Sequence, residues 1–460
     1  QHQMLARLAI IGVGATIAIV CVKRHNCYKR RRLKSFSRPL GGVEQLMSSL
    51  HRATGDLVVV AAARVDTLRH LPAASLGDAL AQLTNSVPLL NAAIQPSAVS
   101  SCADVLVHSG GYPWRSLFRE HRAKTLREHF EQAMSLPFDD AGPLWRVGRL
   151  TLHTGDACYL VLSAHHAVCD GKTTRLFFQD FLSSVSGIAP VRAWPGPPLE
   201  RVELPPALPV AADMHRKLRV PPPSTALSLD VPCVPFSERR AAVILEALSP
   251  EQLATLRTAC REHSTTVTGA LVAAFAAAAE PLMDKSWDAL DIQVPVDVRR
   301  FLQDEPHSAN AWGNLYAICS VCCERGLGPW RSARVARERI KDEISSRMLL
   351  HGFAGEPAAM KECIASVHKR ILTENFHGRE WASGVSSIGE AAICTSSHAA
   401  TELWFTSSHA VAGVTFLLSA SSVAGGGLFL ALDFSRPLTS EQTAQAFMHR
   451  LRFVLERFCS

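Results

Sequence analysis

The stretch HHAVCDG, from His165 to Gly171, says more about the fold than any other part of the sequence. It follows the apolar run ACYLVLSA at 157–164, which predicts a buried strand, and it precedes a helix that we expect to begin near Thr173. Adjacent side chains on a strand point to opposite faces, so two consecutive histidines cannot both line one cavity. If the alternation of the strand continues into the motif, the side chain of His166 lies on one face of the strand and that of His165 lies on the opposite face.

Three residue types in this stretch carry chemistry. A neutral imidazole, with an ordinary pKa near 6.5, is a natural general base for a hydroxyl or an amine at neutral pH. The acceptor-only carboxylate of Asp170 needs an Arg or a backbone partner if it is buried, and Gly171 permits a positive φ where the chain leaves the strand. Taken alone, two histidines and an aspartate this close together also fit a structural or a metal-linked cluster.

The rest of the body alternates short strands with amphipathic helices, as α/β proteins do. The expected strands are 57–65, the hairpin formed by 146–153 and 157–164, the alternating run 291–299, and the hairpin 414–433. The expected helices include one over Leu76, Leu80 and Leu83 and one that begins after a capping Ser249. Pro295 suggests that its strand lies at an edge or contains a bulge.

The chain divides into four parts. Residues 1–35 form an N-terminal membrane anchor with a basic flank, and residues 36–202 form a first lobe that carries HHAVCDG. Residues 203–235 begin with the Pro-rich run ELPPALPVAADMHRKLRVPPP, which cannot join a central sheet and is typical of a linker. Residues 236–460 form a second lobe.

The N-terminal part carries the positive charge. The chain of 460 residues has a net charge of +7, but residues 1–43 contain nine basic side chains and no acidic one, so the remaining 417 residues carry −2. A folded body without excess positive charge argues against nucleic-acid binding.

The apolar run Met4–Val22 is long enough for one transmembrane helix, and seven cations follow it, so we expect a single-pass membrane protein with its body in the cytosol. A mitochondrial membrane and a cleaved secretory signal are the alternatives.

Other motifs are weaker. The 13 cysteines include one CxxC, from Cys319 to Cys322, but no second pair at zinc spacing, so we expect reduced cysteines and no metal site. There is no GxSxG elbow and no HExxH motif, which argues against the simplest serine hydrolases and zinc proteases. The string TSSHA occurs twice, at 395–399 and 406–410, and coincidence is the preferred interpretation in a chain rich in Ser, Ala and His.

HHAVCDG is similar to the HHxxxDG motif of the chloramphenicol acetyltransferase-like superfamily. This superfamily includes peptide-synthetase condensation domains, polyketide-associated acyltransferases, wax ester synthases and fungal alcohol acetyltransferases. Further stretches resemble its landmarks in matching order, over about residues 37–460: FDDAGPLWR at 138–146, VPVDVRR at 294–300, Gly313 with Asn314, SSIGE at 386–390 and LALDFSRP at 430–437.

The resemblance implies a fold and a set of site residues. The fold is two lobes, each a mixed sheet with helices, which meet at a tunnel. His166 is then the general base, His165 supports the motif, and Asp170 is structural and pairs with an Arg of the second lobe. Arg299 is the candidate for that Arg, although a local pairing with Asp297 is the alternative. Ser386 or Ser387 could donate to the oxyanion.

The resemblance also implies an activity. We expect a membrane-anchored acyltransferase that moves an acyl group from acyl-CoA, a co-substrate, to an alcohol, with no bound cofactor. The chain departs from the family where DFSRP replaces the plant ending DFGWG and where Ser386-Ser387-Ile388-Gly389 replaces Ser-Asn-x-Gly. The alternatives are a catalytically silent scaffold or binding subunit of the same fold, and a condensation enzyme that depends on a carrier protein. The anchor favours a lipophilic acceptor, and the oligomeric state stays open.

Overall fold

The computed structural model describes residues 37–97, 104–155, 157–188, 227, 230–231, 234–283, 285, 288–301, 310–346 and 379–459. Two expected features, the membrane anchor within 1–35 and the Pro-rich run at 203–223, lie outside these residues. Among the described residues no single helix is both long and apolar enough to cross a bilayer. Two consecutive helices, Pro250–Glu262 and Val267–Leu282, pass such a test only as a pair, with a bend of 97° between them.

The first half of the chain is built on a five-stranded mixed sheet with the strand order β12-β2-β7-β6-β5. Its strands are β2 (Val58–Arg64), β5 (Phe118–Ala123), β6 (Trp145–Leu152), β7 (Cys158–His165) and β12 (Glu402–Ser407), and its helices are α2 (Gly42–Thr54), α3 (Ala73–Ser86), α5 (Leu126–Met134) and α6 (Gly171–Val185). A small sheet of β1 (Ser37–Pro39), β4 (Val105–His108) and β3 (Ala92–Gln95), with the short α4 (Trp114–Leu117), completes this half.

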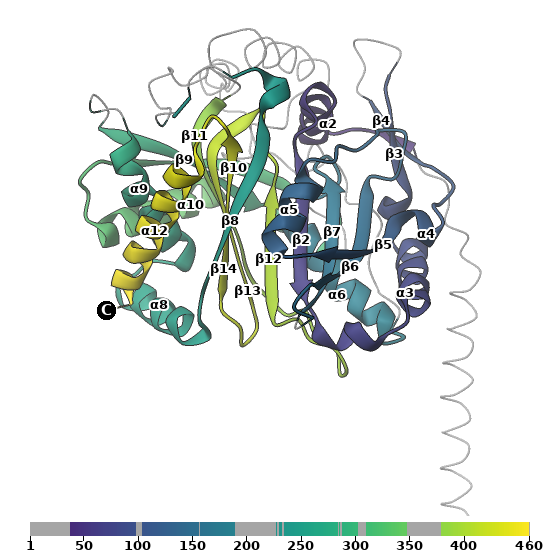
Figure 1. The fold of residues 1–460 in the computed structure, drawn as a ribbon. Helices are drawn as coiled ribbons and strands as arrows, with labels where there is room; N and C mark the ends of the chain where they lie inside the picture. The colour runs from purple at the N-terminus through teal and green to yellow at the C-terminus, as the bar shows by residue number, and fades with distance from the viewer. Residues whose placement is uncertain are drawn as a thin grey trace, which may run out of the picture. The chain divides into compact units, whose positions relative to one another are not determined.

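The second half contains a six-stranded mixed sheet with the order β10-β9-β11-β13-β14-β8. Its strands are β8 (Arg240–Leu248), β9 (Ala289–Asp297), β10 (Tyr316–Glu324), β11 (Arg379–Ala391), β13 (Gly413–Val423) and β14 (Leu428–Arg436). Its helices are α8 (Pro250–Glu262), α9 (Val267–Ala279), α10 (Pro329–Ser346) and α12 (Glu441–Phe458). Helices α9, α10 and α12 pack together on one face of the sheet (Figure 1). The nearly all-apolar α9 lies among them, as a helix without a polar face requires.

One strand joins the two halves. The chain leaves the second sheet after β11, forms β12 and returns to the second sheet as β13 (Figure 1). β12 pairs antiparallel with β2 of the first sheet along six residues, from Glu402 opposite Arg64 to Ser407 opposite Val59. The segment that follows β12 therefore lies close to the end of β7, where the motif begins.

Most expected elements are present. The hairpin of β6 and β7, the strand at 58–64 and the Ser249 cap, whose side chain accepts from Gln252 N–H, match the sequence predictions. The apolar face of β9 is buried as expected, at Leu290, Ile292, Val294 and Val296. The expected mixed α/β fold with two sheet-bearing lobes is confirmed.

Two expectations need correction. β9 is not an edge strand, because β10 pairs along its whole length and β11 pairs with Ile292 and Gln293 on the other side. Pro295 lies beyond that short β11 contact, so its missing N–H costs no ladder bond there. Arg299 does not belong to the strand, which ends at Asp297, but to a 3-10 turn, Arg299–Phe301.

Candidate active site

The motif begins where β7 ends. The N–H of His165 donates to Leu144 O at 2.9 Å, and the N–H of His166 donates to Leu57 O at 3.2 Å. The chain then turns, and Asp170 becomes the N-cap of α6, where its Oδ1 accepts from Thr173 N–H at 2.7 Å. A capping carboxylate is favourable there because it satisfies a free N–H and faces the positive end of the helix dipole.

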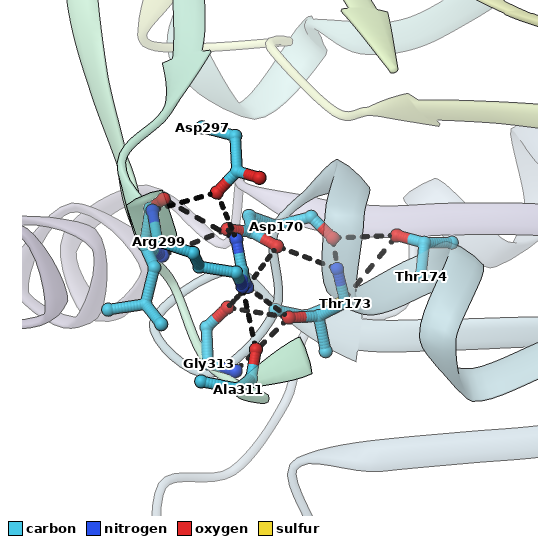
Figure 2. Close-up of polar contacts among 9 residues, drawn as sticks. Asp170, Thr173, Thr174, Asp297, Arg299, Ala311 and Gly313 are labelled. Atoms are coloured by element: carbon cyan, nitrogen blue, oxygen red, sulfur yellow. Dashed lines mark hydrogen bonds and ion pairs between the residues drawn. The ribbon is translucent and has the colours of Figure 1, made fainter. Parts of the chain in front are cut away.

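Asp170 and Arg299 form a buried ion pair between the two halves (Figure 2). Arg299 Nη1 lies 2.8 Å from Asp170 Oδ2, and Nη2 lies 3.0 Å from Oδ1, so the pair is bidentate. Asp170 Oδ2 also accepts from Leu315 N–H at 2.9 Å. The side chains are only 5% and 1% exposed, respectively, so water cannot substitute for these bonds.

The remaining donors of Arg299 are also used. Its Nε donates to Ala311 O at 2.6 Å, and its Nη2 donates to Gly313 O at 3.0 Å and to Thr173 Oγ1 at 2.9 Å (Figure 2). Nη1 also lies 3.0 Å from Asp297 Oδ1, so both pairings considered for Arg299 occur together. Burial alone would raise the pKa of Asp170, but the charge and hydrogen bonds of Arg299 lower it below its usual value. Both groups are therefore charged at neutral pH.

Gly171 has a different role from the one expected. It does not have a positive φ, and it is the first residue of α6. A Cβ at this position would lie 2.3 Å from Ile388 Cγ2 on β11. The glycine is needed because the second half packs directly against the motif at this point.

His165 is fully buried beneath the motif. Its Nδ1 accepts from Ala167 N–H at 3.0 Å, so the neutral ring carries its proton on Nε2, which lies 3.6 Å from Asp140 Oδ1. The ring packs at 4.3 Å, centroid to centroid, from His51, whose own nitrogens contact the backbone of Asp56 and Phe138. Burial holds the pKa of His165 well below its usual value, so the ring is neutral.

His166 is partly exposed, and its ring centroid lies 5.8 Å from that of Tyr316. Burial lowers the pKa of His166 to about 4, and the charge of His409 acts in the same direction. The charge of Asp170 and the backbone carbonyls of His166 and Cys169 oppose this shift. Burial also raises the pKa of Tyr316, so its phenol stays protonated and able to donate. At neutral pH His166 is an uncharged base beside a phenol.

His409 is a third histidine near the motif, which the sequence analysis did not identify as a site residue. Its Nδ1 lies 2.9 Å from Ser407 O and 3.3 Å from Asp433 Oδ1. Both residues carried sequence signals, since His409 is the histidine of the second TSSHA string and Asp433 lies in LALDFSRP. Nothing in either stretch alone indicated that they meet.

Ser386 and Ser387 lie on β11, opposite Ser419 and Ala420 of β13. Both are partly exposed. Within the described part of the chain no recorded contact joins either hydroxyl to His166. The register of β11 against β13 shifts between Ser387 and Gly389, so Ile388, whose Cγ2 approaches Gly171, lies at an irregularity just after the two serines. The structure thus brings together His165, His166, Asp170, Gly171 and Arg299, and leaves the two serines on a neighbouring strand.

Sequence comparison identifies one family. The model of the alcohol acetyltransferase family matches residues 204–459, which is more than half of the chain. This match covers the second half and excludes the HHAVCDG motif itself. No curated protein matches the chain by sequence similarity.

Solved structures share the fold at low identity. The TRI3 trichothecene 15-O-acetyltransferase from Fusarium sporotrichioides is 13% identical, with a TM-score of 0.72 over 92% of this chain and 95% of that one. The epimerization domain from the third module of tyrocidine synthetase B is 15% identical, with a TM-score of 0.64 over 92% and 97%. The condensation domain of the Monacolin K polyketide synthase MokA is 14% identical, with the same TM-score and the same coverage. The expected superfamily is confirmed.

Proposed function

The chain belongs to the alcohol acetyltransferase family, and from this premise we propose that it transfers an acyl group from acyl-CoA to an alcohol with His166 as the general base. One observation carries the proposal. His166 lies at the end of β7 as a neutral, partly exposed imidazole, while the residues around it are held by the buried Asp170–Arg299 pair. A base must be unprotonated before it can accept a proton, and the low pKa of His166 provides that state at neutral pH.

The reaction needs no covalent enzyme intermediate. The acceptor hydroxyl gives its proton to a ring nitrogen of His166 while its oxygen attacks the thioester carbonyl and forms the new C–O bond. The C–S bond of the tetrahedral intermediate then breaks, and the thiolate takes the proton back from the imidazolium. The negative charge of Asp170 favours that imidazolium. Proton transfer contributes about 10²–10⁴ in rate, and the alignment of both substrates supplies much of the rest.

The oxyanion needs hydrogen-bond donors. We propose Ser386 or Ser387, because both hydroxyls lie on β11 within two residues of Ile388, which approaches the motif at Gly171. His165 supports the site from below as a neutral group that cannot compete for the transferred proton.

We also propose that residues 1–35 anchor the enzyme in a membrane with its body in the cytosol, and that the acceptor is lipophilic. The support is the apolar run Met4–Val22 followed by a cationic flank. Deletion of residues 1–35 should release the protein from membranes and lower its rate with membrane-dissolved alcohols. An unchanged rate would show that the anchor does not supply the substrate.

The test is thiol release from a panel of acyl-CoAs by the full chain, with alcohols and amines as acceptors. His166→Ala should lower the turnover by about 10²–10⁴, while the exposed His153→Ala should not change it. Turnover that survives in His166→Ala would exclude this residue as the base. If the folded wild-type chain releases no thiol from any acyl-CoA of the panel, the acyl-CoA reaction is excluded. A carrier-protein donor or a catalytically silent scaffold would then be favoured.

A further inference from the structure

The carboxylate of Asp140 faces the ring of His165, and the reaction above does not use it. Asp140 Oδ1 lies 3.6 Å from His165 Nε2, and both atoms are buried without a hydrogen-bond partner among the described residues. Nε2 carries the proton of the neutral ring, because Nδ1 accepts from Ala167 N–H. A buried N–H and a carboxylate oxygen thus face each other just beyond hydrogen-bond length. In the protein interior the charge of Asp140 still acts on this N–H at that distance.

The histidine beside this contact is bonded elsewhere. The ring of His51 packs on that of His165, but His51 Nε2 accepts from Phe138 N–H at 2.9 Å. Its Nδ1 then carries the proton and faces the carbonyl of Asp56. His51 therefore has no ring nitrogen left to accept from His165, and Asp140 is the acceptor that faces Nε2.

Arg52 leaves one oxygen of Asp140 for His165. The guanidinium of Arg52 donates through Nε at 2.8 Å and through Nη2 at 2.6 Å, and both bonds end on Asp140 Oδ2. The backbone of Asp140 is also held, since its carbonyl accepts from Ile94 N–H on β3 at 2.8 Å. The position of the Asp140 carboxylate is thus fixed from two sides, with Oδ1 directed at His165.

The tautomer of His165 matters for the turn that carries His166. With the proton on Nε2, Nδ1 accepts from Ala167 N–H at 3.0 Å, so the side chain of His165 spans the backbone of His166. With the proton on Nδ1, two donors would face each other, and Ala167 N–H would lose its partner. His166 lies between the two bonded residues, so the loss of this bond would displace it.

We infer that Asp140 is a positioning residue for the base His166: its carboxylate keeps the proton of His165 on Nε2 and so fixes the turn that places His166. This inference rests on the proposed function of His166. Asp140 acts through His165 and not through a substrate. The carboxylate of a serine-protease triad fixes a histidine tautomer in the same way, although there that histidine is itself the base.

A purely structural role for Asp140, as the partner of Arg52, predicts different results. In Asp140→Asn the new amide should turn its oxygen to the Arg52 guanidinium and its NH2 to His165. That NH2 is a donor, so it favours the tautomer with the proton on Nδ1. Arg52→Gln is the matched control, because it removes the ion pair and keeps the Asp140 carboxylate. The Arg52 side chain is 43% exposed, so we expect this variant to fold.

The first measurement is kcat and KM of the full chain for thiol release, with the acyl-CoA and alcohol that react fastest. Asp140→Asn should lower kcat by about 10- to 100-fold with little change in KM, the range found when the outer partner of a metal-bound histidine is removed. Arg52→Gln should keep most of kcat. Asp140→Ala introduces no competing donor and should lose less than Asp140→Asn, and thermal melts show that each variant is folded. An unchanged kcat in Asp140→Asn, or an equal loss in Arg52→Gln, overturns the inference.

A double-mutant cycle tests whether the effect passes through His165. The amide oxygen of His165→Asn can accept from Ala167 N–H, and this variant has no atom at the place of Nε2. In this background Asp140→Asn should lower kcat no further. A second loss as large as that in the wild-type background would mean that Asp140 acts by another route.

The 15N spectrum of the full chain with ring-labelled histidine reports the tautomer without any substrate. The signals of His165 are identified by their absence in His165→Asn. We expect the proton on Nε2 in wild type and in Arg52→Gln, and on Nδ1 in Asp140→Asn. The same tautomer in wild type and Asp140→Asn overturns the inference even if the enzyme is active. If no acyl-CoA is turned over, the proposed function fails, and this spectrum still decides whether Asp140 sets the tautomer of His165.

Discussion

Two polar regions lie within a few residues of each other and differ in how completely they are bonded. In the first, both oxygens of Asp170 and all three guanidinium nitrogens of Arg299 have hydrogen-bond partners. In the second, His165 Nε2, His166 Nδ1 and Asp140 Oδ1 are buried without a hydrogen-bond partner among the described residues. The first region joins the two halves of the chain, and the second lies at the end of β7.

The difference separates side chains whose hydrogen-bonding capacity is used up within the fold from side chains that still have capacity for a further bond. A buried charge is stable only when it is paired and fully bonded, so a saturated cluster has no capacity left for a substrate. Buried polar atoms without partners are rare in folded proteins, and each requires an explanation. Here they belong to the two histidines of the motif and to the carboxylate beside them.

Removal of one partner from the saturated region should have the largest effect on stability. Asp170→Ala leaves the buried Arg299 guanidinium with the partly exposed Asp297 as its remaining carboxylate partner, which should lower the free energy of unfolding by about 3–5 kcal/mol. Asp297→Ala is the control, because its side chain is 37% exposed and Arg299 keeps its bonds to Asp170. Urea denaturation of the three proteins measures both losses. Equal losses in the two variants would contradict the special role of the Asp170 pair.

Acid should destabilise the protein through histidines whose pKa is lowered in the native state. Burial lowers the pKa of both His166 and His129 to about 4. Between pH 6.5 and 4 these histidines are protonated in the unfolded chain but stay neutral in the native protein. The free energy of unfolding is therefore highest above pH 6.5 and decreases as the pH falls. Each histidine contributes up to about 3 kcal/mol to this loss.

The measurement is the free energy of unfolding at several pH values between 4 and 7.5. His166→Gln and His129→Gln should each flatten the profile, whereas only His166→Gln should lose acyl transfer. A profile of His166→Gln as steep as that of wild type would mean that His166 is not a neutral buried base. The pair of variants thus separates a lowered pKa, which both histidines share, from a role in acyl transfer.

The sequence predicted the saturated region better than the open one. Asp170 was expected to need an Arg because a buried carboxylate must be paired, and Arg299 follows an alternating strand that a period of two reveals. The role of Gly171 was mistaken, because sequence shows that a side chain is excluded there but not whether φ or a close neighbour excludes it. The neighbour, Ile388, is more than 200 positions away along the chain.

The position of His409 depends on strand order, which local sequence patterns do not contain. His409 approaches His166 only because β12 leaves its chain neighbours and pairs with β2. The two TSSHA strings make the point directly, since five identical residues place His398 on the surface and His409 next to Asp433. Identical local sequences cannot distinguish these settings. The contact of His165 with Asp140 likewise requires the packing of a loop that sequence did not place.

A methyl group at Gly413 should displace the ring of His409 and lower the stability by a moderate amount. Gly413→Ala combines a residue at φ +115 with a Cβ that would lie 2.4 Å from the His409 ring, so we expect a loss of about 1–3 kcal/mol. Gly110→Ala is the control for φ alone, because Gly110 has φ +87 and no atom within 4 Å of the added Cβ. Thermal and urea denaturation measure both variants. If Gly110→Ala lost as much stability as Gly413→Ala, the cost at 413 would come from backbone strain and not from the ring of His409.

The smallest effect should come from an arginine that is bonded but exposed. Arg452 on α12 lies 2.8 Å from Glu246 on β8 and 3.0 Å from Glu456, so its contacts are as short as those of Arg299. Its side chain is 39% exposed, and water can replace either carboxylate, so Arg452→Ala should cost less than about 1 kcal/mol, and 1 M salt should remove most of that difference. Urea denaturation at low and high salt measures it. A loss near that of Asp170→Ala would mean that bond length, and not burial, sets the strength of these ion pairs. The distinction between the saturated region and the open region would then have no physical basis.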